Sequence, residues 1–243
     1  MNLLIDMGNT RLKWAVARAG QITAGSPLVN NRINRDELVG LWENIYRPKQ
    51  LVVSCVSANQ LLELVQSVAL DLWPDVDIIL VKSQAQAFGV INAYRQPEKL
   101  GVDRWLTLIA VWQQYQRPAC IVDCGTAITI DLIDADGRHQ GGLISPCLTL
   151  MKKSLGQGTE ALPFSRTKHV FALANYTEAA IYSGTLTAAI GLIEHVLAKQ
   201  PENTQLILTG GDADLIAGQL DIVSIVDPDL VLRGLLCVLE GHA

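Results

Sequence analysis

Clusters of basic residues are nearly absent from this sequence. The longest basic run is Lys152-Lys153, and the formal net charge of the 243 residues is −5. A protein that binds nucleic acid needs a concentrated basic surface, because it has to neutralise backbone phosphates. The sequence therefore argues against a nucleic-acid partner.

Long apolar segments are also missing. The longest charge-free stretch with a helical pattern, Ala179–Ile193, contains Thr and Ser and is shorter than the roughly 20 residues that cross a bilayer. The N-terminus leads directly into the apolar run Asn2–Ile5, without the basic segment that begins a secretory signal. We therefore expect a cytoplasmic protein with no membrane partner.

The cysteines and histidines form no metal-binding pattern. The five cysteines include no Cys-x-x-Cys pair, and the four histidines (139, 169, 195 and 242) are scattered. The sequence therefore supports neither a zinc site nor a histidine-based triad. An odd number of cysteines in apolar contexts favours buried free thiols in a reducing compartment.

Apolar residues, in contrast, are plentiful. Hydrophobic residues make up 49% of the chain and charged residues 18%, which is enough for a substantial core in one or two domains. Two capping boxes, Asn34–Glu37 and Ser57–Gln60, predict helix starts. The predicted helices are 34–42, from 57, 101–116, 149–156, 177–198 and from 228, with a short one after 211. The predicted strands are 2–6, 11–16, 21–29, 51–53, 77–81, a hairpin over 119–133, a strand up to 144, 205–209 and 222–226.

The order of these elements is similar before and after Pro118. Each half begins with three strands and continues with alternating helices and strands. An internal duplication explains this order. We therefore expect an α/β protein with two duplicated domains, residues 1–117 and residues 118–243.

One loop occurs near the start of each half. Asp6–Thr10 follows the first apolar run, Asp123–Thr126 follows Cys120–Val122, and an alternating stretch comes after each loop. Each unit predicts two strands joined by a tight glycine turn. Backbone N–H groups and a Thr hydroxyl can donate to an anion, and an Asp can hold a metal ion. A single such turn could be purely structural, but the pair favours a phosphotransfer site that clamps a nucleotide from both sides.

The segment Gly101–Arg104 begins a predicted helix and allows two interpretations. Asp103 could cap the helix by accepting hydrogen bonds from its first N–H groups. It could instead accept a proton from a substrate hydroxyl, while Arg104 binds a carboxylate. Spacing alone does not choose between them. Lys13 is similarly open: it could reach back to a phosphate or extend into solvent.

The duplicated plan with its Asp-x-Gly hairpins resembles the superfamily of actin, sugar kinases and acetate kinase. This resemblance implies an actin-like ATPase fold, in which two ribonuclease-H-like domains hold ATP in the cleft between them. Longer motifs, in collinear order over nearly the whole chain, resemble the type III pantothenate kinases. They are Phe88–Tyr94, Leu100–Trp105, Asp123–Asp131, Gly141–Pro146, Thr177–Gly184 and Leu208–Gly211.

This closer resemblance implies an activity: ATP-dependent phosphorylation of pantothenate to 4′-phosphopantothenate, the first step of coenzyme A biosynthesis. It implies that ATP is bound by Asp6, Met7, Gly8, Asn9, Thr10, Arg11, Leu12, Lys13, Thr126, Gly210 and Gly211. It implies that pantothenate is bound by Tyr94, Gly101, Val102, Asp103, Arg104 and Thr177, with Asp103 as the proton acceptor. Asp6 would face Mg²⁺, through water, and Asp123 would hold a monovalent cation, K⁺ or NH₄⁺. The family also forms homodimers in which the residue matching Thr177 reaches the neighbouring subunit's substrate.

Two positions depart from the family pattern. Cys147 stands where the family usually has Gly, which could alter the start of a helix. Tyr176 stands where it usually has Asn, which could reshape the substrate pocket. Neither position belongs to the proposed acid–base or phosphate groups.

Two other classes of function stay open. The chain could be a related small-molecule kinase or a polyphosphate phosphatase, which a substrate panel would separate. It could also be a non-catalytic regulatory protein, because some relatives were first described as accessory factors for transcription. The carboxylates of Asp6, Asp103 and Asp123 argue against a pure binding module, which has no need of them.

Overall fold

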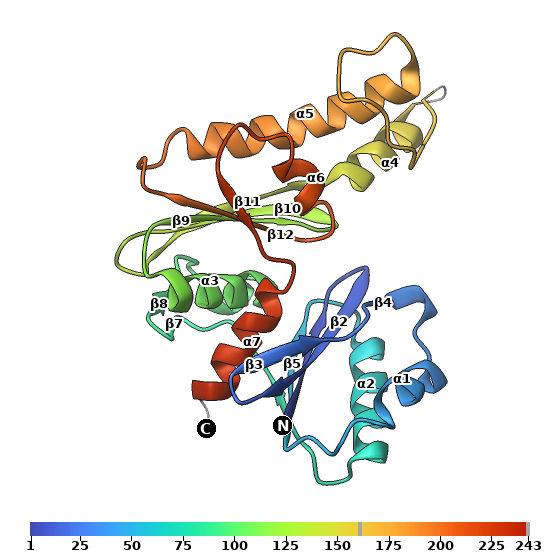
Figure 1. The fold of residues 1–243 in the computed structure, drawn as a ribbon, viewed down its shortest axis with the longest axis vertical. Helices are drawn as coiled ribbons and strands as arrows, with labels where there is room; N and C mark the ends of the chain where they lie inside the picture. The colour runs from blue at the N-terminus through green and yellow to red at the C-terminus, as the bar shows by residue number, and fades with distance from the viewer. Residues whose placement is uncertain (160–161, 242–243) are drawn as a thin grey trace. The chain divides into compact units, whose positions relative to one another are not determined.

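A computed structural model describes residues 1–159 and 162–241 (Figure 1). The histidine at position 242 lies outside the described residues. The chain forms two compact units: residues 1–116, 137–139 and 229–241 make the first unit, and residues 117–136 and 140–228 make the second. The chain thus divides close to Pro118, but the C-terminal segment, expected within 118–243, belongs to the first unit.

The first unit contains a mixed sheet with the strand order β3-β2-β1-β5-β6, and β4 also pairs with β2. Its strands are β1 (Asn2–Met7), β2 (Arg11–Arg18), β3 (Gln21–Ala24), β4 (Leu28–Val29), β5 (Gln50–Cys55) and β6 (Asp77–Leu80). β1 and β2 form the predicted antiparallel hairpin, whereas β1, β5 and β6 are parallel. The strand predicted over 21–29 is divided into β3 and β4, because the intervening Pro27 has no N–H for the sheet.

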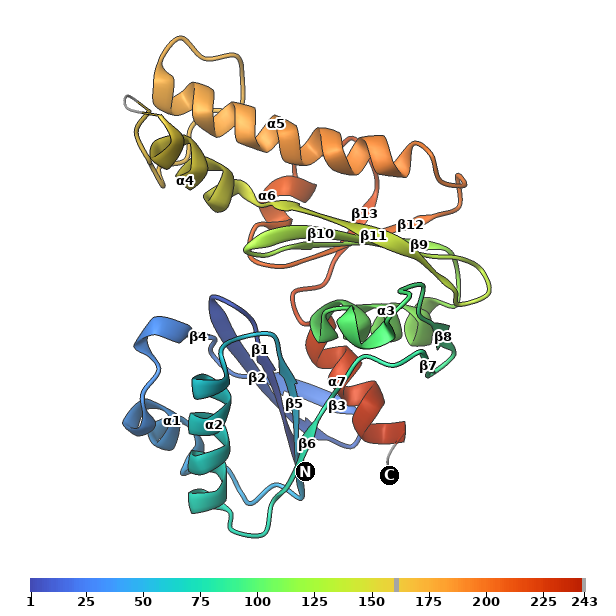
Figure 2. The ribbon, with the colours of Figure 1, turned by 180° about the vertical axis from the view of Figure 1, so that it is seen from behind.

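Helices cover both faces of this sheet (Figures 1 and 2). They are α1 (Arg35–Trp42), α2 (Asn59–Leu72), α3 (Val102–Tyr115) and α7 (Leu230–Gly241), with short 3₁₀ turns at Asn30–Arg32 and Pro97–Lys99. Leu3, Ile5 and Met7 share one core with Trp42 and Trp73. α7 contacts β1, β2, β5 and α3. A Cβ on Gly234 of α7 would lie 2.3 Å from the carbonyl oxygen of Leu106, so this close approach requires glycine. Packing against β1 explains why α7 belongs to the first unit.

One of the two predicted capping boxes is confirmed as a cap and the other is wrong. Asn34 accepts a hydrogen bond from the backbone N–H of Glu37, at 2.9 Å, and begins α1. α2 begins after Ala58, which offers no side-chain hydrogen bond. Because the helix starts one residue later than predicted, Ser57 lies outside the capping position.

The second unit repeats the sheet of the first, with the order β11-β10-β9-β12-β13. Its strands are β9 (Ala119–Cys124), β10 (Ala127–Ile133), β11 (His139–Pro146), β12 (Gln205–Thr209) and β13 (Ser224–Val226). β9 and β10 form an antiparallel hairpin, and β12 is parallel to both β9 and β13. Hairpin, third strand and two parallel strands therefore recur in the same spatial order, which confirms the predicted duplication.

Three helices accompany this sheet: α4 (Leu148–Gly158), α5 (Thr177–Leu197) and α6 (Ala213–Ala217). α5 buries large residues in the core, including Leu186, Ile190 and Ile193. Its exposed residues include a stripe of small uncharged side chains: Ala180, Gly184, Thr187, Ala188 and Gly191. Small residues also occur on the buried side of α5, at Ala179, Ser183 and Ala189.

By length and composition alone, α5 is also the one described helix that could cross a membrane. The sequence prediction considered only the charge-free run 179–193, whereas the helix has 21 residues. In its most apolar 18 residues, 39% are buried in the protein. A helix that packs in a protein core has the same length and apolarity.

The cysteines are free thiols, as predicted. Cys120, Cys124 and Cys147 are buried, and Cys55 and Cys237 are half-buried. Burial, followed by the nearby charge of Asp131, raises the pKa of Cys120 to about 12. A thiol with such a pKa is a poor nucleophile at neutral pH.

Candidate active site

The first candidate phosphate loop is the turn between β1 and β2. Gly8 N–H donates to the carbonyl oxygen of Arg11 at 3.0 Å and closes the turn. Asn30 fixes it from outside, because its side chain donates to the Gly8 carbonyl at 2.7 Å and its N–H donates to the Thr10 carbonyl at 3.0 Å. Asn9 at the turn and its neighbours Thr10 and Arg11 are exposed. Hydrogen bonds therefore fix the conformation of the loop, and its polar groups are accessible.

Side chains alternate across this hairpin. Asp6 and Lys13 are opposite each other in the register, and so are Met7 and Leu12. Met7 and Leu12 are fully buried in the core. Of the eight residues predicted to bind ATP here, these two can offer only backbone atoms. Asp6, in contrast, is on the opposite face at the end of β1.

Ser54 on β5 is a candidate residue of the active site that the sequence analysis missed. It is paired with Asp6 across the parallel strands and is completely buried. Within the described chain its hydroxyl has no hydrogen-bond partner. The available signal was a polar residue directly after the apolar run 51–53, but in the sequence it looks like an ordinary strand residue.

The second candidate loop joins β9 and β10. Gly125 N–H donates to the Ala127 carbonyl at 3.1 Å, and Asp123 precedes this turn. The Gly210 turn after β12 approaches it closely: Asp212 N–H donates to the Cys124 carbonyl at 3.0 Å. Cβ atoms added to Gly210 and Gly125 would lie 2.5 and 3.1 Å from Asp123 Oδ1. The Asp123 carboxylate thus lies close to the backbone of both glycines, where a side chain would crowd it.

Replacing Gly210 with Ala should therefore damage this loop. Its φ is +93°, and a Cβ would lie 2.5 Å from the backbone carbonyl carbon of Cys124. We expect a loss of about 1–3 kcal/mol in unfolding free energy and a higher KM for ATP. Denaturant unfolding and steady-state kinetics measure the two effects. Gly40→Ala is the control, because an added Cβ there meets nothing within 4 Å; equal behaviour of the two variants would contradict the close approach.

Cys147 begins α4 without disturbing it. Its φ and ψ are −86° and 175°, an extended conformation open to any residue. Its thiol donates to Asp212 Oδ2 at 3.4 Å. Burial, with the adjacent Asp212 charge, raises the pKa of Cys147 to about 12. The thiol thus stays protonated and connects the start of α4 to the Gly210 turn.

The first unit also contains the candidate acceptor site, meaning the site for the molecule that would receive the phosphate. It includes Tyr94, Asp103 and Arg104. Arg104 Nη1 donates to the Tyr94 hydroxyl at 2.8 Å, and its guanidinium carbon is 5.6 Å from the Tyr94 ring centroid. Arg104 is only 6% exposed. A buried guanidinium that is held in one orientation is suited to bind a carboxylate with two parallel hydrogen bonds.

Asp103 is not the cap of α3. The cap is Gly101, which has no side chain, and Asp103 is the second helical residue. Its Oδ1 accepts a hydrogen bond from Arg104 N–H at 2.8 Å. The side chain of Val102 is buried in the core, so only its backbone is available to a substrate. Asp103 thus binds an N–H of the first helical turn, although the cap position itself is Gly101, so a structural role and a role in proton transfer both remain open.

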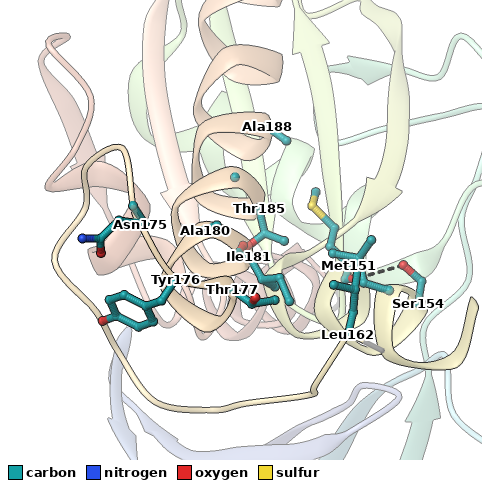
Figure 3. A pocket seen from close by; sticks show the side chains of 13 residues that line it. Met151, Ser154, Leu162, Asn175, Tyr176, Thr177, Ala180, Ile181, Thr185 and Ala188 are labelled. Carbon is teal, nitrogen blue, oxygen red and sulfur yellow. Dashed lines mark hydrogen bonds between the residues drawn. The ribbon is translucent and has the colours of Figure 1, made fainter. Parts of the chain in front are cut away.

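Thr177 lies in the second unit, beside a cavity of about 820 Å³ (Figure 3). Tyr176 and Thr177 at the start of α5 are on one side of the cavity, and Met151, Ser154 and Leu162 are on the other. The Tyr176 hydroxyl is 3.0 Å from His169 Nδ1. The departure at position 176 thus places an aromatic ring, held by His169, at the rim of this cavity.

The predicted site residues are therefore divided between the units. Asp6–Lys13, Tyr94 and Gly101–Arg104 belong to the first unit, and Asp123, Thr126, Thr177, Gly210 and Gly211 belong to the second. Among the described residues, no group of three or more His, Cys, Asp or Glu side chains could hold a metal ion. A Mg²⁺ ion that arrives with a nucleotide needs only one or two carboxylates, because phosphates and water supply its other ligands.

Similar folds define the class to which the protein belongs. A solved structure described as a Baf family transcriptional activator from Campylobacter jejuni matches with a TM-score of 0.62 and 21% identity, covering 99% of this chain and 98% of that one. A structure described as a 2-dehydro-3-deoxygalactonokinase from Sinorhizobium meliloti matches with a TM-score of 0.62 and 11% identity, covering 100% of this chain and 99% of that one. Two repeated sheets with Asp-containing hairpins give the protein the fold of the actin-like ATPases and sugar kinases.

Sequence comparison then defines the family. The family model described as type III pantothenate kinase matches residues 2–199. The type III pantothenate kinase of Nitrosococcus oceani is 36% identical over 257 residues, which cover 97% of this chain and 92% of that protein. The chain belongs to the type III pantothenate kinase family.

Proposed function

We propose that this protein transfers the γ-phosphate of ATP to the primary hydroxyl of pantothenate and produces 4′-phosphopantothenate, the first step towards coenzyme A. Family membership over residues 2–199 carries the proposal. The cluster of Tyr94, Asp103 and Arg104 supports it, because it combines a proton acceptor with a carboxylate-binding group. Release of ADP that depends on pantothenate tests it.

The two hairpin loops would bind the nucleotide. Exposed groups of Asn9, Thr10 and Arg11, with backbone N–H groups, can donate to phosphate oxygens. Thr126 offers a hydroxyl from the second loop, and the Gly210-Gly211 turn would lie against the adenosine. When bound, Mg²⁺ would neutralise phosphate charge, and Asp6 is the side chain that would hold it, through water.

The acceptor site would position pantothenate and accept its proton. Arg104 would pair with the carboxylate of the vitamin, which explains how a protein of net charge −5 attracts an anion. Asp103 would accept the proton as the hydroxyl attacks phosphorus. Phosphoryl transfer needs little covalent chemistry from the protein, so positioning and charge neutralisation provide most of the acceleration.

The other functions are less well supported. Relatives named type III pantothenate kinase match almost the full chain, which does not favour a different small-molecule kinase or a polyphosphate phosphatase. The similarity to a structure described as a transcriptional activator shows the fold alone. We further propose a cytoplasmic enzyme, in the compartment where ATP is made and used.

We also propose that Asp123 holds a monovalent cation. The position of Asp123 near the end of β9, with its carboxylate beside the glycine turns at Gly125 and Gly210, supports this. We expect low activity in sodium or Tris buffers and a rise when potassium or ammonium is added. Asp123→Ala should lose the response to potassium, whereas Asp136→Ala, an exposed carboxylate on the turn after β10, should keep it. Equal wild-type rates in sodium and potassium would contradict the proposal.

We propose, finally, a homodimer with shared substrate sites. A stripe of small uncharged residues is exposed on α5, at Ala180, Gly184, Ala188 and Gly191, and would allow a second chain to approach closely. Thr177 is exposed at the start of the same helix, next to the cavity of about 820 Å³. It would contact the pantothenate bound by the neighbouring subunit.

A further inference from the structure

His139 is a buried histidine that no step above uses. It is 3% exposed and is the first residue of β11. With Gly137 and Arg138 it belongs to the first unit, although the rest of β11 belongs to the second. A backbone hydrogen bond explains this. Ile91 N–H donates to the Gly137 carbonyl at 2.9 Å and attaches residues 137–139 to the segment 91–94, here called the acceptor loop because it carries Tyr94 of the candidate acceptor site.

His139 makes two contacts with that loop. Ala93 N–H donates to its Nδ1 at 3.4 Å. Its ring stacks on the Tyr94 ring, with centroids 6.1 Å apart and an interplanar angle of 16°. Because Nδ1 accepts a hydrogen bond, the proton of the neutral imidazole is on Nε2. Hydrogen bonding and stacking thus act on two consecutive residues of the loop.

The loop is fixed from the other side by Asn92. Asn92 Oδ1 accepts a hydrogen bond from Tyr94 N–H at 3.0 Å, and its Nδ2 donates to the carbonyls of Gln84 and Pro97 at 3.1 and 3.3 Å. These bonds hold the Tyr94 backbone. They do not fix the orientation of the Tyr94 ring, which contacts the imidazole of His139 by stacking and Arg104 through its hydroxyl.

We propose that His139 is a positioning residue of the acceptor site. It fixes the Tyr94 ring so that the Tyr94 hydroxyl holds the Arg104 guanidinium ready for the substrate carboxylate. This inference rests on the proposed function, in which Arg104 binds that carboxylate. A guanidinium on a long flexible side chain binds more tightly when its orientation is fixed in advance, because less freedom is lost on binding.

A histidine at this position does two things that no other single side chain combines. A phenylalanine could stack on Tyr94 but would leave the Ala93 N–H without this acceptor. An asparagine could place an oxygen close to the position of Nδ1 but could not stack. Phenylalanine should therefore keep the stacking and asparagine the hydrogen bond, whereas alanine should keep neither contact.

Steady-state kinetics of three variants test the proposal. We expect His139→Ala to raise the KM for pantothenate about tenfold, from the loss of one stacking contact and one hydrogen bond. The KM for ATP and kcat should change little. His139→Asn and His139→Phe should each recover part of the loss. An unchanged KM for pantothenate in His139→Ala, or an equal rise in the KM for ATP, would overturn the proposal.

Two controls separate positioning from general support of the fold. Gln113 Nε2 donates to the Phe88 carbonyl at 2.7 Å, at the start of the segment that leads to Tyr94. Gln113→Ala should leave the KM for pantothenate unchanged. In a Tyr94→Phe background, which removes the hydroxyl, His139→Ala should add little further effect. Full additivity of the two substitutions would overturn transmission through Tyr94.

Crystal structures without substrate provide a test that is independent of turnover. In the wild type, Arg104 should donate to Tyr94 and His139 should stack on the ring. In His139→Ala, the Tyr94 ring should rotate and the hydrogen bond to Arg104 should be lost. An unmoved ring would refute the role of His139. If the wild type instead fails to phosphorylate pantothenate, the proposed function is refuted, and these structures still decide whether His139 fixes Tyr94.

Discussion

Replacing Asp103 with Asn should lower kcat by about 10²–10⁴ while substrate binding is largely kept. Asparagine has the same shape, and its Oδ1 can still accept the hydrogen bond from Arg104 N–H that Asp103 accepts at 2.8 Å. The start of α3 should therefore remain folded. Only the ability to take a proton from the pantothenate hydroxyl is lost.

Rates at saturating ATP and pantothenate, with the KM of each, measure this effect. Glu98→Gln is the matched control, because it makes the same chemical change at an exposed residue of the turn before α3. That variant should keep the wild-type kcat. Near-normal turnover by a folded Asp103→Asn protein would rule out Asp103 as the general base.

Mixing two inactive variants should restore activity if substrate sites are shared between subunits. Asp103→Asn removes the proton acceptor of one site, and Thr177→Arg places a large cation where a neighbouring chain's substrate would bind. Thr177 is exposed at the first position of α5, so the substitution should not unfold the helix. In a mixed dimer one site would carry both changes and the other site neither.

Random pairing makes about half of the dimers mixed, so the mixture should recover roughly a quarter of wild-type activity. Subunit exchange has to be confirmed separately, for example with chains of different mass. If both residues serve the same chain's site, each site keeps one defect and mixing recovers nothing. That result, with exchange confirmed, would refute the shared site.

Much of the fold could be predicted because strand alternation and glycine turns are local signals. The hairpins that present Asp6 and Asp123 were predicted from such patterns, and both are confirmed. Packing between distant segments was not predictable in this way. The return of α7 to the first unit depends on its fit against α3 and β1.

The directions of the side chains at the candidate site could not be predicted from the sequence. Met7 and Leu12 belong to the predicted ATP loop, yet their side chains enter the core. Only the register of β1 and β2 separates them from Asp6 and Lys13. His139 could not have been recognised at all, because its partner Tyr94 is 45 positions away in the chain and is brought near by backbone pairing at Ile91.

The most direct test of the whole account is to incubate the purified protein with ATP, Mg²⁺, potassium and pantothenate, and to measure ADP together with the phosphorylated product by mass spectrometry. The account predicts one 4′-phosphopantothenate for each ADP, and ADP release that stops when pantothenate is omitted. ADP release that is independent of pantothenate, or no phosphorylated product from a folded protein, would contradict it.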